Sequence, residues 1–131
     1  MASGLVKTAF RSGAELTSGA TLPRGTLVQF MIYVDNPTGV TVSDLNVSDV
    51  LDPGFSYQVS SIKVDNSAAT GSAPADVYLA VNAAAPVTDA NDGDVAGISG
   101  ATITAGSTGG NGQLDIAPNA VWAILFDVTV Q

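Results

Sequence analysis

Two long segments of the chain place apolar side chains at every second position, and this alternation constrains the fold more than any other feature. The first runs from Thr26 to Asp35 and the second from Val121 to Val130. Successive side chains of an extended strand point to opposite faces of its sheet, so alternate residues share one face. These shared faces are apolar: Val28, Phe30, Ile32 and Val34 in the first segment, and Trp122, Ile124, Phe126, Val128 and Val130 in the second. We therefore expect both segments to be core strands.

Five shorter segments have strand-like composition, and turn-forming Gly, Pro, Asn and Asp residues separate them. They are Leu5–Phe10, Val40–Asp49, Tyr57–Val64, Ala101–Ala105 and Gln113–Ala117. Many short strands without internal repeats predict an all-β fold, an antiparallel β-sandwich of about seven or eight strands. A length of 131 residues suits a single domain covering 1–131.

The segment 72–86 differs from the rest, because it is rich in Ala and carries helix signals at both ends. Ser72 is a possible N-cap, Pro74 and Asp76 suit a first turn, and Pro86 ends the segment. We expect a short helical insertion with its helix over about 75–84. The alternative is a strand over Val77–Val81.

The chain contains no His and no Cys, which excludes Ser-His-Asp and Cys-His nucleophiles, zinc and iron–sulfur sites built on those ligands, and disulfides. Its closely spaced acids Asp44, Asp49 and Asp52 are best interpreted as turn and cap residues. We expect no enzymatic activity. A net charge of −8 makes nucleic acid an unsuitable partner. The sequence contains no run of about 18 apolar residues, so we expect no membrane insertion.

One loop concentrates oxygen ligands around a glycine: Asp89, Asn91, Asp92 and Asp94 surround Gly93. Calcium takes about six to eight oxygen ligands from closely spaced carboxylates and carbonyls. The spacing departs from the EF-hand, because the glycine is one position early and no Glu follows at the twelfth position. Two interpretations remain, a calcium site at these four residues or a solvated acidic loop. We expect no other cofactor.

Charged residues make up 12% of the chain, about half the usual fraction, so part of its surface is expected to be covered by a partner. The faces of the two long strands opposite their core residues carry Leu27, Met31, Tyr33 and Leu125. If the strands adjoin, these residues form an outer apolar patch, covered by the Ala-rich helix or by a neighbouring subunit. The N-terminal segment 1–10, with Leu5, Val6 and Phe10, can pair with its own sheet or be exchanged into a neighbour's sheet. These seven residues are our predicted interface.

Two stretches resemble a known family. Gly25–Asn36 is a glycine followed by an alternating strand and an Asn turn, and Val47–Tyr57 contains a Leu-Asp-Pro-x-Gly corner before an aromatic strand. Together with Pro118–Val130 they resemble the conserved-repeat surface domain of bacteria and archaea, the immunoglobulin-like family labelled domain of unknown function number eleven. Asp52, inserted between Leu51 and Pro53, departs from that family's corner, as do the helical and Gly-rich segments from its short domain.

The resemblance implies an immunoglobulin-like sandwich within an exported envelope or appendage protein. Met1–Gly4 has no signal-peptide character, so either the protein stays inside the cell until lysis or the chain is a mature or recombinant form. From the resemblance we expect a location at the cell surface or outside the cell. We expect a non-catalytic structural subunit that self-assembles into an extracellular filament, appendage or surface layer, with copies of itself as partners. The alternatives are a virion or capsid decoration protein, located in the virion, and a carbohydrate- or ligand-binding surface module.

Overall fold

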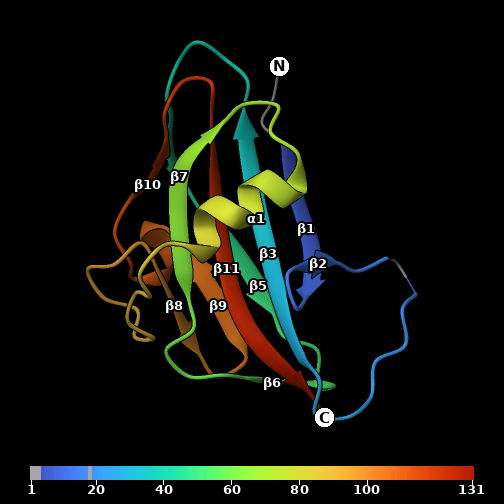
Figure 1. Cartoon of the computed structure of the whole chain (residues 1–131). Coiled ribbons are helices and arrows are strands. Elements are labelled where there is room, and N and C mark those ends of the chain that lie inside the picture. Colours follow the sequence, from blue (N-terminus) through green and yellow to red (C-terminus); the bar gives the residue numbers. More distant parts are fainter. Residues whose placement is uncertain (1–3, 18) are drawn as a thin grey trace.

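The computed structural model describes residues 4–17 and 19–131, and it is built mainly of antiparallel strands with one α-helix (Figure 1). The elements in chain order are β1 (Gly4–Arg11), β2 (Ala14–Glu15), β3 (Leu27–Asn36), β4 (Val42–Leu45), β5 (Val47–Val50), β6 (Phe55–Tyr57), β7 (Lys63–Ala69), α1 (Pro74–Asn82), β8 (Ala96–Ser99), β9 (Thr102–Ala105), the 3₁₀-helix η1 (Ser107–Gly109), β10 (Leu114–Ile116) and β11 (Ala120–Val130). The predicted all-β class with antiparallel sheets is confirmed.

The largest sheet is built around the two strands that the alternation predicted. Its order is β2-β1-β3-β11, and both β6 and β7 pair with the far side of β11. β3 and β11 are antiparallel over ten residue pairs, so that Phe30 lies opposite Phe126 and Val34 opposite Trp122. These apolar pairs point into the interior of the molecule, and Trp122 is 3% exposed, as expected for a core residue rather than a carbohydrate platform.

Two smaller sheets, β5-β9-β8 and β10-β4, form a second layer of strands. The main core lies between this layer and the large sheet and is built from both: Val28, Ile32, Val34, Val47, Leu51, Ile62, Ala96, Ile103, Ala105, Leu114, Ile116, Trp122, Ile124, Phe126 and Val128. The predicted strand Val40–Asp49 is divided at Asn46 into β4 and β5, which belong to different sheets. The prediction of one strand over Tyr57–Val64 is wrong. Ser60 turns the chain there at a φ of 61°.

Helix α1 covers the other face of the large sheet. It begins with Pro74 at its first turn and ends at Asn82, close to the predicted range, so the alternative of a strand over Val77–Val81 is wrong. The Tyr78 ring stacks on Phe10 at 4.2 Å between centroids, and its hydroxyl bonds the side chain of Gln29. Lys63 donates to the backbone carbonyl of Asn82 at the helix C-terminus, where a cation is favoured by the helix dipole.

Side chains of α1 and of the large sheet form a second hydrophobic cluster, and their burial corrects part of the predicted interface. Phe10, Met31, Tyr33 and Leu125 are all buried, packed with Val77 and Val81 of the helix. The chain's own helix therefore covers the outer apolar face, so these four residues are not available to a neighbour. Within the described part of the chain, no helix has the length and apolar character needed to cross a membrane.

Candidate functional site at the sheet edges

Strand β1 is the long edge strand of the large sheet. It pairs with β3 from Gly4 to Phe10, so its own sheet holds residues 4–10, and residues 1–3 of the predicted segment lie outside the described residues. On the outer side, β2 pairs with Phe10 and Arg11, and Leu16 donates to the carbonyl of Ala9. The backbone N–H and C=O groups of successive residues in a strand point to opposite sides of it. Those of Leu5 and Lys7 therefore point outward, as those of Ala9 do. No described residue pairs with them.

The exposed members of the predicted interface lie mainly along this edge. Leu5 is 60% exposed and Val6 is 40% exposed, while Leu27, at the start of β3, is 51% exposed. Edge strands of monomeric proteins are commonly protected by bulges, short length or charged side chains that discourage pairing with another chain. Here the one charged side chain of the open stretch, Lys7, is 40% exposed and is paired with an acid of the same chain. Its Nζ lies 2.9 Å from a carboxylate oxygen of Asp49 on β5.

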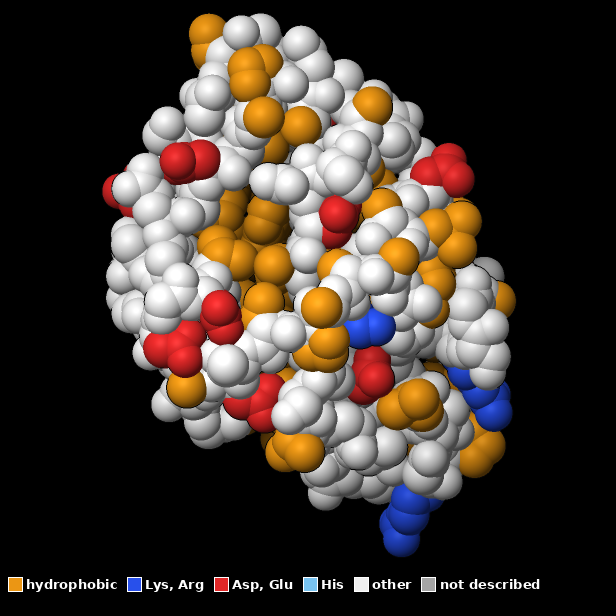
Figure 2. Space-filling view, turned by 60° about the vertical axis from the view of Figure 1, so that its left-hand side comes forward, with side chains coloured by type: hydrophobic (Ala, Val, Ile, Leu, Met, Phe, Trp, Pro, Cys, Tyr) orange, Lys and Arg blue, Asp and Glu red, His pale blue; other side chains and the backbone are white. Residues whose placement is uncertain are grey.

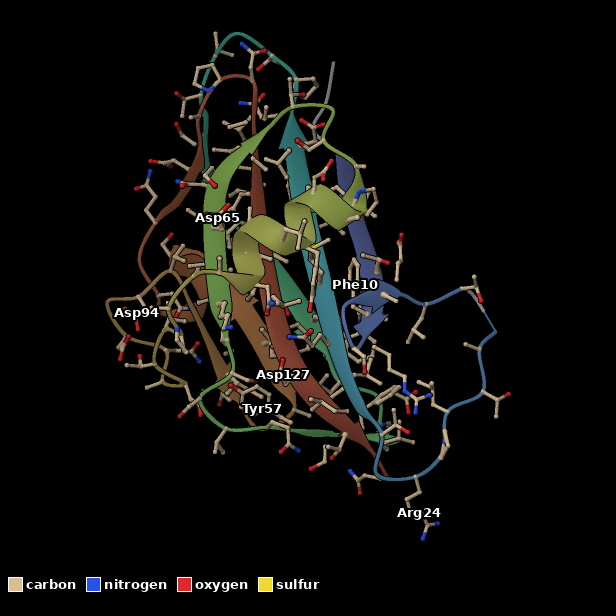
Figure 3. The ribbon with its side chains drawn as sticks, in the orientation of Figure 1. Phe10, Arg24, Tyr57, Asp65, Asp94 and Asp127 are labelled. Carbon is tan, nitrogen blue, oxygen red and sulfur yellow. The ribbon has the colours of Figure 1, made fainter. Side chains whose placement is uncertain are left out.

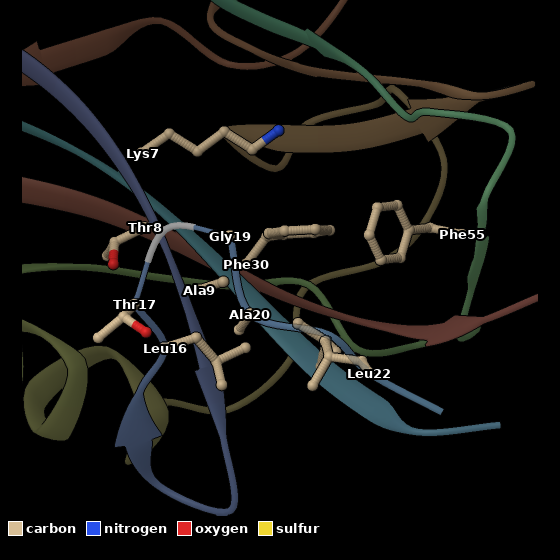
Figure 4. A pocket seen from close by; sticks show the side chains of 11 residues that line it. Lys7, Thr8, Ala9, Leu16, Thr17, Gly19, Ala20, Leu22, Phe30 and Phe55 are labelled. Carbon is tan, nitrogen blue, oxygen red and sulfur yellow. The ribbon is translucent and has the colours of Figure 1, made fainter. Parts of the chain in front are cut away.

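A first groove adjoins β1, between the strand and the loop that follows β2 (Figure 4). Its volume is about 510 Å³, and apolar side chains from three parts of the chain form most of its wall. Phe30 meets Phe55 edge-on at 5.0 Å between ring centroids, and the Lys7 ammonium lies 4.8 Å from the centroid of the Phe30 ring. Leu16 and Leu22 of the loop complete the apolar surface.

A second groove lies on the opposite side of the molecule, between β7 and β10. Figure 2 shows this side, with a hollow whose floor is hydrophobic. Its volume is about 250 Å³, and its lining residues are Val64, Asp65, Asn66, Val95, Gln113, Leu114, Asp115 and Trp122. Among the described strands, β7 pairs with β11 and β10 with β4, so each borders the groove with an edge that carries no strand.

The two sides differ in charge. Asp65 and Asp94 lie on the side of the second groove, whereas Arg24 lies on the far side of the molecule (Figure 3). Hydrogen bonds from the Thr88 hydroxyl and backbone N–H lower the pKa of Asp94. Hydrogen bonds from the backbone N–H of Asp44 and from the Gln113 amide lower the pKa of Asp115. Both carboxyls are therefore ionised at neutral pH.

The predicted calcium ligands are held by donors of the protein itself. Asp89 accepts from the Tyr57 hydroxyl at 2.6 Å and from the backbone N–H of Ser60, while Asn91 accepts from the Thr104 hydroxyl. Asp92 and Asp94 both lie within hydrogen-bonding distance of the Thr88 hydroxyl. Among residues 4–17 and 19–131, no three Asp, Glu, His or Cys side chains form a group that could hold a metal ion. Calcium binding stays a prediction for this loop.

The three acids interpreted as turn and cap residues also have structural partners. Asp44 accepts from the Ser107 hydroxyl, Asp49 pairs with Lys7, and Asp52 accepts from the backbone N–H of Gly54. Sequence reasoning did not find the second groove, because its floor combines residues of β7, β10 and β11 that are far apart in the chain. Trp122, in the core face of the last strand, was the one member of the groove that the alternation had singled out.

Comparisons with family models, with curated proteins and with solved structures find no match to the chain. The resemblance to the conserved-repeat surface domain therefore stays a prediction that rests on the residues quoted for it.

Proposed function

We propose that the protein is a non-catalytic structural subunit that self-assembles through the edges of its sheets into an extracellular filament, appendage or surface layer. The observation that carries this proposal is the outer edge of β1. There the backbone groups of Leu5 and Lys7 have no partner among the described residues, and Leu5 and Val6 are exposed. Two layers of strands around one core also support the finer proposal of an immunoglobulin-like sandwich.

Strand addition would satisfy two needs of this edge at once. A neighbouring strand would pair the outward N–H and C=O groups, and it would remove Leu5 and Val6 from water. Burial of one Leu or Val side chain contributes roughly 1.5–3 kcal/mol, which becomes substantial when the contact repeats along an array. The first groove adds apolar surface next to the same edge.

The test compares two double variants that add the same charge at different places. Leu5→Glu/Val6→Glu puts carboxylates on the edge, and Val40→Glu/Val59→Glu puts them on residues that are 68% and 79% exposed elsewhere. Light scattering and electron microscopy at physiological salt should find assemblies for the unmodified chain and for the second variant. The edge variant should stay monomeric, with an unchanged circular dichroism spectrum. An unmodified chain that is monomeric at high concentration would refute the proposal.

A ligand-binding role is the second candidate, and the first groove favours it. Its volume lies in the range of small-molecule sites, and its wall is mostly apolar with one ammonium group at Lys7. The fluorescent probe anilinonaphthalene sulfonate, which is apolar and anionic, should bind the folded chain, and Phe55→Ala should weaken that binding. Equal fluorescence for both proteins would remove this candidate.

A further inference from the structure

We propose that the β1 edge of one copy docks against the groove between β7 and β10 of a second copy, so that the contact is head-to-tail. This inference rests on the proposed function and names the two surfaces that meet. Its occupant is a second copy of this chain, because one surface offers an open strand edge with Arg11 at its end and the other offers an open strand edge with an acidic rim.

The groove is bordered by an open strand edge that can pair with the open edge of β1. Strand β10 is bordered by β4 on one side, and its other edge faces the groove without a strand among those described. Strand β7, across the groove, is a poorer partner for a ladder. It is bulged against β11, and the Asp65 carboxylate accepts from the backbone N–H of Ser67. An incoming strand edge is therefore expected to pair with β10 and to cover the apolar floor.

The rim of the groove is acidic. Asp65 and Asp115 line it, and Asp94 precedes Val95 in its wall. The cation nearest to it in the sequence, Lys63, is engaged by the carbonyl of Asn82 at 2.9 Å. The rim therefore presents a net negative charge toward a docking partner.

The β1 side carries both signs of charge, because the exposed Glu15 of β2 lies opposite Phe10. Its cations can meet the acidic rim. The chain has four Lys and Arg residues, and two of them, Arg11 and Arg24, are exposed and make no side-chain hydrogen bond or ion pair with any residue that the structure describes. Arg11 ends β1 itself, and Arg24 lies on the side of the molecule away from Asp65 and Asp94 (Figure 3). Two copies placed side by side in one orientation bring Arg11 of one toward the acidic rim of the other.

The same charges disfavour symmetric contacts. Antiparallel pairing of β1 with β1 through its open stretch would place the two Arg11 side chains at opposite ends of the ladder, away from any acidic rim, so it gains none of this attraction. Pairing of groove with groove would bring two acidic rims together. Like charges that face one another across an interface are costly. The head-to-tail contact that remains joins unlike surfaces, so it generates a ring or an open chain of subunits rather than a closed dimer.

The experiment uses two full-length variants, each of which loses one surface. The edge variant is Leu5→Glu/Val6→Glu. The groove variant is Asn66→Lys/Gln113→Lys, which adds two cations at exposed positions and leaves Asp65 and Asp115 in place. Its matched control is Ala75→Lys/Ala83→Lys, with the same added charge at exposed positions of α1 and its C-cap. Circular dichroism and thermal unfolding establish that each variant is folded.

Each variant alone should be monomeric at a concentration at which the unmodified chain and the control assemble. An equimolar mixture should form a one-to-one heterodimer that grows no further, because only the edge of the groove variant and the groove of the edge variant are intact. If the groove variant is unfolded, Arg11→Glu replaces it, since it leaves the groove untouched and should raise the concentration needed for assembly about tenfold or more.

Two results overturn the inference and leave self-assembly intact. One is a folded groove variant that assembles as the unmodified chain does, and the other is an Arg11→Glu variant without effect. An unmodified chain that never assembles would instead refute the proposed function. The two failures are therefore distinguishable.

Discussion

At the scale of single residues, the side-chain amide of Asn36 is a buried polar group that depends on several hydrogen-bond partners. It is fully buried at the end of β3, and its Nδ2 donates to the carbonyl oxygens of Val40, Ile116 and Ala117 at 2.8, 3.2 and 3.0 Å. Its Oδ1 accepts from the backbone N–H and the hydroxyl of Thr38. One amide thus connects the end of β3 to the second layer of strands.

Loss of this amide should be costly. Asn36→Ala leaves buried carbonyl groups without a donor, and we expect it to lower the free energy of unfolding by about 3 kcal/mol in urea denaturation. Asn36→Asp, of the same size, replaces the donor with an acceptor and should cost at least as much. Asn66→Ala, at an exposed position of β7, should change stability by less than about 0.5 kcal/mol. A cost below about 1 kcal/mol for Asn36→Ala would show that water replaces the amide.

Tyr57 gives a prediction about pH. Burial, and next the hydrogen bond to Asp89, raise the pKa of Tyr57 to about 12 from the ordinary 10.0. Since the pKa in the folded state lies above that of the unfolded chain, the neutral phenol stabilises the fold fully below pH 10, and this stabilisation is lost as the pH rises through 12. The difference in thermal stability between the unmodified chain and Tyr57→Phe should therefore shrink between pH 10 and 12. A difference that stays constant over that range would contradict the shift.

At the scale of elements, local signals predicted the helix and the two long strands. Pro74, Asp76 and the Ala-rich run lie within the helical segment itself, and period-two alternation needs no knowledge of distant residues. The break in Tyr57–Val64 could not be predicted in this way. Ser60 is held at a positive φ by the carboxylate of Asp89, which lies 29 residues further along the chain.

Strand β8 and the candidate site were missed for a similar reason. β8 contains Gly97, where an added Cβ would lie 2.6 Å from the carbonyl oxygen of Ala90, so the strand depends on a close approach of two backbones. The second groove lies between β7 and β10, which belong to different layers and face each other with edges that carry no described strand. Leu5 and Val6 were predicted from the sequence as interface residues. The structure leaves both exposed on an edge strand, and their role in an interface stays a prediction. The burial of Met31 and Tyr33 depends on where α1 docks, which the sequence pattern left open between two alternatives.

The docking of α1 can itself be measured. Val81 is fully buried against the large sheet, whereas Leu79, on the same helix, is 66% exposed. Val81→Ala should lower the free energy of unfolding by about 1–3 kcal/mol, because it removes buried methyl groups and leaves a cavity. Leu79→Ala should leave stability within about 0.5 kcal/mol in the same denaturation assay. Equal effects of the two changes would mean that the helix does not pack on this face in solution.

At the scale of the whole molecule, net charge opposes assembly and is insensitive to pH. The chain has no His and no Cys, so none of its side-chain types has an ordinary pKa between about 4.5 and 10. The side-chain charge of −8 is therefore expected to stay nearly constant from about pH 5.5 to 8.5, and a terminal amino group, with an ordinary pKa of about 7.7–8.0, changes the net charge by less than one unit. Any dependence of assembly on conditions in that range should come from ionic strength.

The effect of salt follows from comparing two terms. Two copies with charge −8 and centres about 35 Å apart repel by about 2.4 kcal/mol in 0.01 M salt, where the Debye length is about 30 Å, but by about 0.1 kcal/mol in 0.15 M salt, where it is about 8 Å. An attraction between Arg11 and a carboxylate about 4 Å away loses only about 0.3 kcal/mol over the same change, because the distance is short.

The fall in long-range repulsion therefore exceeds the attraction that one or two local ion pairs lose over the same change in salt. The net gain is about 1.7–2.0 kcal/mol, and about 1.4 kcal/mol corresponds to a factor of ten. We therefore expect the concentration needed for assembly to fall about 15- to 30-fold between 0.01 and 0.15 M salt. Sedimentation velocity across this range, repeated at pH 6 and pH 8, measures the effect, and the two pH series should coincide. Assembly that weakens as salt rises through this range would show that local attraction between the edges outweighs the repulsion between whole molecules.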